Sequence, residues 1–153
     1  MPRTIADLVR RDAPLLRADQ PVGEALGVLL ESSLPALPVI DPDERYVGIF
    51  GEREFITALF PGYVGSLKHA GFVTKSIDSV LEKRSACRFE SVSAHMNKEH
   101  VDVGPDFSDV GLAETFIHHR VLIVPVTEHR KVLGVITRSG FFTALAERFI
   151  ENG

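Results

Sequence analysis

The sequence of 153 residues contains no tryptophan, two tyrosines, two methionines and one cysteine. The single cysteine, Cys87, cannot form a disulfide within the chain, which fits a reducing compartment. No apolar run approaches the roughly 20 residues that a membrane-spanning helix needs. Residues 1–14 also lack the apolar core of a secretory signal peptide. We therefore expect a cytoplasmic protein that does not enter a membrane.

An excess of charge of one sign is also missing. The net charge is −4 at pH 7, with 44% hydrophobic and 25% charged residues. This composition is typical of a globular protein of about one compact domain. A chain without a positive excess has no general electrostatic attraction to nucleic acid or anionic lipid. We expect neither as a partner.

The motifs that indicate common enzymes are absent from the sequence. There is no G-x-x-x-x-G-K-[ST] phosphate loop and no G-x-S-x-G serine, and the glycines of "GYVGSLKHAGF" do not form a G-x-G-x-x-G pattern. Cationic neighbours of Cys87 would lower the pKa of its thiol. No His or Asp partner can be assigned to it from the sequence, so we interpret Cys87 as an inert or modifiable thiol. We expect a protein that is not an enzyme.

The histidines do not follow a metal-binding pattern. Metal-binding helices present histidines four residues apart on one face, whereas His118 and His119 are adjacent and point apart. No C-x-x-C pair supports them. We interpret all six as surface residues and expect no metal site; they are His69, His95, His100, His118, His119 and His129.

The chain does contain an internal repeat. "GIFGEREFITAL" at residues 48–59 is matched by "GVITRSGFFTAL" at residues 134–145. The Pro-Val pair at 38–39 aligns with the pair at 125–126 at a shift of 87 residues, which places Ile5 on Val92 and Val9 on Met96. One residue deleted from the second loop changes the shift to 86 for the last segment. We expect repeats at residues 1–60 and 92–153, separated by an insert at residues 61–91.

Each copy shows the same order of predicted elements. A short strand ("APLLR", "HVDVG") precedes a helix with apolar residues at helical spacing. Two Val- and Ile-rich strands follow ("ALPVID" and "RYVGIF", "LIVPVT" and "KVLGVIT"), and a helix closes the copy ("EREFITALF", "SGFFTALAERFI"). A unit this small buries too little surface to stand alone. We expect two α/β (α+β) repeats, each β-α-β-β-α, packed with pseudo-twofold symmetry.

The insert has no counterpart in the repeat. "SLKHAGF" and "SIDSVLEKRSACRFE" predict one or two short helices, with an apolar stripe at Ile77, Val80 and Leu81. Two interpretations stay open. The insert is either a connector packed on its own module or a surface for a partner or for a second copy of the chain.

The element order, the segments "LPVID" and "VPVTE", and the glycine-apolar run before each last helix resemble a tandem pair of cystathionine-β-synthase-type (CBS) domains, a Bateman module. The insert lies outside the resemblance. The resemblance implies a regulatory module that binds an adenosine-containing ligand such as AMP, ATP, NAD or S-adenosylmethionine between the repeats and signals to an unknown protein partner. An alternative is a dimeric scaffold that has lost nucleotide binding.

In the family, the last helix begins with Ser or Thr, followed three residues later by Asp. A hydroxyl at this position caps the helix, and the free N–H groups and dipole of the helix start attract phosphate. The first copy has Gly51 and Glu54, so it keeps the acid and lacks the hydroxyl. The second copy has Thr137 and Gly140, so it keeps the hydroxyl and lacks the acid.

The first turns of both last helices also carry an arginine that is placed to meet a phosphate, Arg53 and Arg138. The alternative is that Thr137 and Glu54 only cap their helices and the arginines are solvated. The resemblance implies that adenine lies between the first strand and the residues before each Pro-Val pair. The implied nucleotide-binding residues are Pro14, Leu15, Leu37, Pro38, Gly51, Arg53, Glu54, Val101, Val103, Ile123, Val124, Pro125, Thr137, Arg138 and Gly140.

The two last helices carry more apolar side chains than one face against a sheet requires. Large exposed apolar patches mark association surfaces, and the family resemblance implies a homodimer through these helices. The expected contact residues are Phe55, Ile56, Leu59, Phe60, Phe141, Phe142, Leu145 and Phe149.

Overall fold

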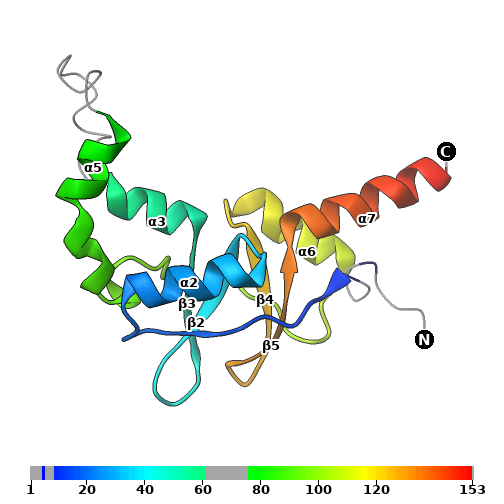
Figure 1. Ribbon diagram of the computed structural model, residues 1–153. Helices are drawn as coiled ribbons and strands as arrows, with labels where there is room; N and C mark the ends of the chain where they lie inside the picture. Colours follow the sequence, from blue (N-terminus) through cyan, green and yellow to red (C-terminus); the bar gives the residue numbers. More distant parts are fainter. Residues whose placement is uncertain (1–4, 6–8, 61–75, 153) are drawn as a thin grey trace.

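The computed structural model describes residue 5, residues 9–60 and residues 76–152 of the chain. The helix predicted for "SLKHAGF" lies outside the described residues. Two small sheets stand side by side, one for each copy of the repeat, with helices packed around them (Figure 1). The predicted α/β fold of two pseudo-symmetric repeats is confirmed.

The first copy has the predicted element order. It consists of β1 (Leu16–Arg17), α2 (Val22–Ser32), β2 (Ala36–Ile40), β3 (Tyr46–Gly51) and α3 (Glu52–Leu59). Strand β1 pairs in parallel with β2, and β2 pairs antiparallel with β3. Helix α2 buries Val22, Ala25 and Leu29 at helical spacing, as the apolar pattern predicts.

The second copy contains α6 (Asp109–His118), β4 (Ile123–Glu128), β5 (Lys131–Thr137) and α7 (Arg138–Glu151). Strands β4 and β5 form an antiparallel pair. The strand predicted at "HVDVG" is reduced to one parallel bridge between Val103 and Val126. The two β4–β5 turn residues, His129 and Arg130, have φ angles of 52° and 65°, as a two-residue hairpin loop of right-handed twist requires.

The segment that leads into each copy pairs with the last strand of the other copy. Arg11 and Val135 exchange two backbone hydrogen bonds of 2.8 Å, and Asn97 and Ile49 exchange two of 2.8 and 3.0 Å. In Figure 1 the chain accordingly starts beside β5 and crosses to the first copy. Each copy therefore completes the sheet of the other.

These bridges correct the alignment of the repeat. Arg11 is structurally equivalent to Asn97, a shift of 86, whereas Leu16 is equivalent to Val103 at a shift of 87. The second copy therefore has one additional residue between the bridge and the first strand. The predicted alignment of Val9 with Met96 is wrong by one residue, because a side-chain match cannot reveal a register that backbone pairing sets.

The two copies share one hydrophobic core. Its largest fully buried side chains include Phe50 of the first copy and Leu112 of the second. Polar groups also join the copies: Tyr46 Oη donates to the Val101 carbonyl at 3.0 Å, and Arg130 Nη2 donates to the Tyr46 carbonyl at 3.0 Å. Burial raises the pKa of Tyr46 far above its ordinary value, so this phenol stays a donor.

The described part of the insert is helical and lies on the first copy. It contains α5 (Ile77–Lys83) and the 3-10 helix η2 (Ser85–Phe89), and the 3-10 helix η3 (Val92–Ala94) follows. Helix η2 packs against α2. Val80 is buried, whereas Ile77 and Leu81 are exposed, so the predicted apolar stripe is only partly covered within the described residues. Among all the described residues of the chain, no helix has the length and apolar character to cross a membrane.

Candidate ligand cavities

A cavity of about 410 Å³ opens at the start of α3, and we call it the copy-1 cavity. Helix α3 contributes three of its lining residues, and the other five come from the second half of the chain. The full lining is Arg53, Glu54, Thr57, Asn97, Glu99, His118, His119 and Arg120. The cavity therefore lies between the two copies and presents both cationic and anionic groups.

The polar groups of the copy-1 cavity are partly paired. Arg53 Nη1 donates to the Arg120 carbonyl, which ties α3 to the segment after α6. His119 Nδ1 lies 3.4 Å from Glu99 Oε2. Partial burial of Glu54 raises the pKa of its carboxyl group, while the backbone N–H groups of Glu54 itself and of Gly51 lower it to a smaller extent.

A second cavity, of about 380 Å³, opens at the start of α7, and we call it the copy-2 cavity. Its lining combines the first turns of α7 with the segment that leads into the first copy. The lining residues are Val9, Arg10, Arg11, Thr137, Ser139, Gly140 and Thr143. Cations and hydroxyls dominate this lining, and its described residues include no carboxylate. Hydroxyls, guanidinium groups and a helix start are the donors that suit a phosphate.

The two cavities occupy equivalent places in the repeat. Thr57 and Thr143 hold the same position in their helices, and each hydroxyl donates to the carbonyl four residues earlier at 2.9 Å. Asn97 and Arg11, the equivalent residues of the two crossing segments, line the opposite side of their cavities. The exchange of segments thus builds each cavity from both halves of the chain.

Comparison with known proteins connects this architecture to a family. The sequence profile of the CBS domain matches residues 5–61. A CBS-domain containing protein from Agrobacterium tumefaciens is 26% identical with a TM-score of 0.68, and the match covers 92% of this chain and 90% of that one. The chain has the fold of a CBS domain pair, and its first repeat matches the CBS-domain profile.

Solved CBS pairs of lower identity share the same fold. The CBS-pair protein CBSX2 from Arabidopsis thaliana has a TM-score of 0.72 at 19% identity, and the match covers 100% of this chain and 99% of that chain. A structure described as CBSX2 in complex with AMP has a TM-score of 0.67 at 18% identity, with 96% and 98% of the two chains covered. At these identities the likeness shows the fold.

Four of the nucleotide-binding residues implied by the resemblance line the two cavities of the CBS pair: Arg53, Glu54, Thr137 and Gly140. Arg138 does not line the copy-2 cavity. It is the structural equivalent of Glu52, because its backbone N–H donates to the Leu122 carbonyl at 3.0 Å as that of Glu52 donates to the Pro35 carbonyl at 2.9 Å. The α7 position equivalent to Arg53 is Ser139.

The remaining implied residues line neither cavity. Most of them are buried: Leu37, Pro38, Val101, Ile123, Val124 and Pro125. Val103 is half-buried, and Pro14 and Leu15 are exposed before β1. Alternation of apolar residues predicts which strands are buried, but it does not distinguish a strand residue that packs in the core from one that lines a ligand site.

The glycine at the start of α3 has a structural cause. A Cβ atom at Gly51 would lie 2.4 Å from Ala36 Cβ and 2.4 Å from the Pro35 carbonyl oxygen. The strand partner therefore excludes a side chain here, whether or not a ligand binds nearby. At Gly140 the described atoms that a Cβ atom would meet are Thr137 Oγ1, at 2.8 Å, and Val9 Cβ, at 3.9 Å.

The sequence pattern did not indicate the cavity residues that lie on the crossing segments and after α6. These are Arg10, Arg11, Asn97, Glu99 and Arg120, together with His118 and His119, which were expected only to be surface residues. The missing signal was the exchange of segments between copies, which no side-chain pattern encodes.

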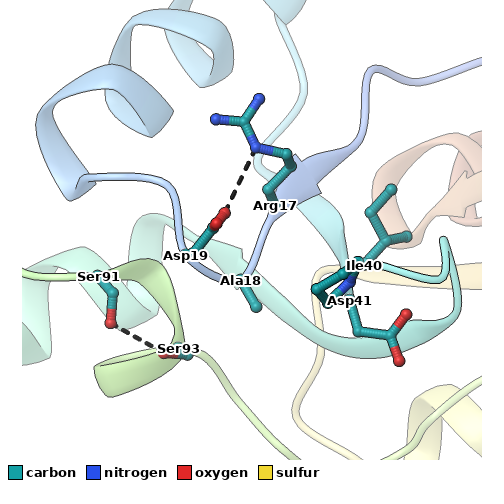
Figure 2. Close-up of a pocket in the computed structure, with 8 residues that line it drawn as sticks. Arg17, Ala18, Asp19, Ile40, Asp41, Ser91 and Ser93 are labelled. Atoms are coloured by element: carbon teal, nitrogen blue, oxygen red, sulfur yellow. Dashed lines mark hydrogen bonds and ion pairs between the residues drawn. The ribbon is translucent and has the colours of Figure 1, made fainter.

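A third cavity, of about 320 Å³, lies at the edge of the first sheet, away from both helix starts (Figure 2). The polar groups that line it are paired with one another or with their own loops. Arg17 Nε lies 3.4 Å from Asp19 Oδ1, and the hydroxyls of Ser91 and Ser93 are 2.8 Å apart. Backbone N–H groups, that of Arg45 first, hold the pKa of Asp41 below its ordinary value. This cavity offers a ligand few unpaired groups.

Cys87 has a partner that the sequence did not reveal. Its Sγ lies 4.0 Å from His95 Nε2, so the expectation that no histidine can be assigned to it is wrong. The expectation of a lowered pKa is also wrong, because burial raises the pKa of the thiol and the neighbouring Glu90 adds to this effect.

Proposed function

We propose that this CBS pair is a non-catalytic regulatory module that binds an adenosine-containing ligand, such as AMP, ATP, NAD or S-adenosylmethionine, in the cavities between its repeats. The observation that carries the proposal is the pair of equivalent cavities, each at the start of a last helix and each lined by both halves of the chain. The AMP complex of CBSX2, a protein of the same fold, supports this ligand class.

The copy-1 cavity has groups for both ends of a nucleotide. The Glu54 carboxylate is an acceptor for ribose hydroxyls, and Arg53 and Arg120 are donors for phosphate. The copy-2 cavity has donors for phosphate in Arg10, Arg11 and Thr137, but no acidic group among the described residues of its lining. We therefore assign the ribose-dependent affinity to the copy-1 cavity.

The position of a ligand between the two copies provides a mechanism by which its binding could be signalled to a partner protein. A ligand in the copy-1 cavity touches α3 of the first copy and the segment after α6 of the second, so its affinity depends on how the two copies pack. Such a ligand favours the packing that it binds best, and a partner protein then responds to the shifted population. We also propose the division into repeats at residues 1–60 and 92–153 with a connecting insert at residues 61–91.

A second candidate is a homodimeric scaffold without a nucleotide. The specific observation in its favour is that Glu54 lies close enough to the backbone N–H groups at the start of its own helix for them to affect its pKa. A carboxylate used in this way is a helix cap and needs no ligand.

A ligand panel separates the two candidates. We expect thermal unfolding of the full chain to shift upward with at least one of AMP, ATP, NAD and S-adenosylmethionine, and not with GMP. Saturation at about 100 times the dissociation constant stabilises a protein by about 2.7 kcal/mol. A panel without any shift, confirmed by calorimetry, supports the scaffold instead.

The variant Glu54→Ala locates the ligand that the panel identifies. Loss of a charge-assisted hydrogen bond of about 1.5–3 kcal/mol lowers affinity about 10- to 150-fold. Glu52→Ala is the matched control, because Glu52 is an exposed acid in the same helical turn and lines neither cavity. Equal affinities of the two variants would contradict a ligand role for Glu54.

A further inference from the structure

One group of side chains outside the cavities carries chemistry that the proposed function does not use. Cys87, Glu90 and His95 bring a thiol, a carboxylate and an imidazole within 4.8 Å of one another. Cys87 Sγ is 4.0 Å from His95 Nε2, and Glu90 Oε1 is 2.7 Å from the same nitrogen. We call these three residues the Cys–Glu–His cluster.

The backbone holds the Cys–Glu–His cluster in place. Cys87 lies in η2, and the backbone N–H of Glu90 donates to the Cys87 carbonyl at 3.0 Å. The Glu90 carbonyl accepts from the Val22 N–H at the start of α2 at 2.9 Å. His95 directly follows η3, and its N–H donates to the Val92 carbonyl at 3.0 Å. Two short 3-10 helices therefore aim the three side chains at one point.

The geometry of the cluster does not suit nucleophilic catalysis. In a nucleophile–base–acid arrangement, one imidazole nitrogen faces the nucleophile and the acid holds the other nitrogen. Here the thiol and the carboxylate both approach Nε2 of His95, so no proton path runs through the ring. Cys87 is also only 3% exposed.

We propose that the Cys–Glu–His cluster binds a tetrahedral divalent cation of the zinc class, with Cys87 Sγ, His95 Nε2 and Glu90 Oε1 as ligands and water as the fourth. A thiolate, an imidazole and a carboxylate are the three ligand types that zinc takes in proteins. The thiolate disfavours magnesium and calcium, which prefer oxygen ligands.

Small side-chain movements adapt the cluster to zinc. Bonds of about 2.3 Å to sulfur and about 2.0–2.1 Å to nitrogen and oxygen place tetrahedral ligand atoms about 3.3–3.6 Å apart. The distance between Cys87 Sγ and His95 Nε2, now 4.0 Å, shortens by about half an ångström, and that between His95 Nε2 and Glu90 Oε1, now 2.7 Å, lengthens by about as much. The thiol releases its proton to solvent, and Nε2 binds the cation with its lone pair.

Arg84 sets a limit on the affinity. Its Nη2 lies 3.8 Å from Glu90 Oε1, and its guanidinium group donates to the Ala58 carbonyl at 2.9 and 3.2 Å. This fixed cation steadies the carboxylate but repels a second positive charge. We therefore expect weaker zinc binding than at a structural site with four protein ligands. The bound cation would join the end of the insert to the start of the second copy.

The test uses the full chain, treated with a chelator and then titrated with Co²⁺. Because the chain has one cysteine, a thiolate-to-cobalt charge-transfer band reports on this site alone. We expect the band to saturate at one equivalent of Co²⁺ and to disappear when Zn²⁺ replaces it. Calorimetry should show Zn²⁺ affinity at least about tenfold lower for Cys87→Ser and His95→Gln.

His100→Gln is the matched control, because His100 is an exposed histidine five residues further along the chain. It should bind Zn²⁺ as the unchanged chain does. Absence of the cobalt band in the unchanged chain overturns the proposal whether or not the variants fold. Zn²⁺ binding that survives in Cys87→Ser, or that falls equally in His100→Gln, also overturns it. None of these results depends on a nucleotide, so the proposed function is tested separately.

Discussion

Glu54 shows how one side chain connects the helix start to the cavity. It is the third residue of α3, it lines the copy-1 cavity, and it lies within reach of the N–H groups of its own helix start. A carboxylate at this position interacts favourably with the helix dipole. Partial burial works in the opposite direction and raises its pKa. The position therefore carries a charge that a cationic or hydrogen-bonding ligand would stabilise further.

The raised pKa of Glu54 predicts a pH-dependent stability. The folded state holds this proton more tightly than the unfolded chain, so the free energy of unfolding falls as pH rises from the ordinary pKa of 4.5 through the raised folded value. Glu54→Gln keeps the shape and the acceptor oxygen but cannot ionise. We expect the variant to be more stable than the unchanged chain at pH 7 and equally stable below about pH 4, as measured by urea unfolding.

The matched control for this prediction is Glu52→Gln, an exposed acid in the same turn of α3. This change should give no stability gain at pH 7, because Glu52 is already solvated. A gain for Glu54→Gln that is the same at both pH values would show that burial of the charge is not its cause.

At the scale of elements, the two last helices begin differently although their sequences repeat. Thr137 caps α7 by accepting a hydrogen bond from the Gly140 N–H at 2.9 Å. Helix α3 begins after Gly51 and has no side-chain cap of this kind. The close approach of Pro35 and Ala36 explains why Gly51 cannot be exchanged for a capping residue.

This difference predicts a stability effect at α7. Thr137→Val keeps the side-chain shape and removes the hydroxyl, so the Gly140 N–H loses its acceptor. Loss of an N-cap costs about 1 kcal/mol, which corresponds to a decrease of about 2–4 °C in the melting temperature of a chain of this size. Thermal unfolding followed by circular dichroism measures it.

Thr143→Val is the control within the same helix. The Thr143 hydroxyl is exposed and donates to the Ser139 carbonyl, which already belongs to the helix. We expect a change within about 0.5 kcal/mol. If both variants lost the same stability, the cap would not be the reason for the effect of Thr137→Val.

The helices and strands could be predicted from the sequence where their apolar side chains recur at helical or strand spacing. Strands β2 to β5 and the helices that follow them were visible in apolar runs and turn residues. The bridge of Arg11 to Val135 was not, because it is made by backbone atoms of a polar segment. The approach of Cys87 to His95 was equally hidden, since 3-10 helices bring together residues eight apart that no helical or strand spacing relates. The cavity residues on the crossing segments depend on such bridges: Val9, Arg10, Arg11, Asn97 and Glu99.

At the scale of the whole molecule, exposed apolar side chains lie on the last helices as well as on other elements such as α2 and α6. Figure 1 shows α3 and α7 on the same side of the two sheets, running apart. Their exposed apolar side chains include Ile56, Phe142, Leu145 and Phe149. Phe141, which the sequence analysis placed in the same surface, is instead buried and stacks on Phe116 with ring centroids 5.8 Å apart. The expected homodimer surface therefore has to exclude Phe141.

We propose that the chain forms a closed twofold dimer through this surface, because twofold pairing is the commonest way for one apolar patch to be covered. Light scattering over a dilution series should give twice the mass of one chain at micromolar concentrations. Phe142→Asp places a charge in the patch, so it should give the mass of a single chain while its circular dichroism spectrum stays unchanged. Leu30→Asp is the matched control, since Leu30 is also a large apolar residue that is exposed, on α2, and it should remain dimeric. A single-chain mass for the unchanged protein, or dissociation by Leu30→Asp as well, would contradict a dimer through the last helices.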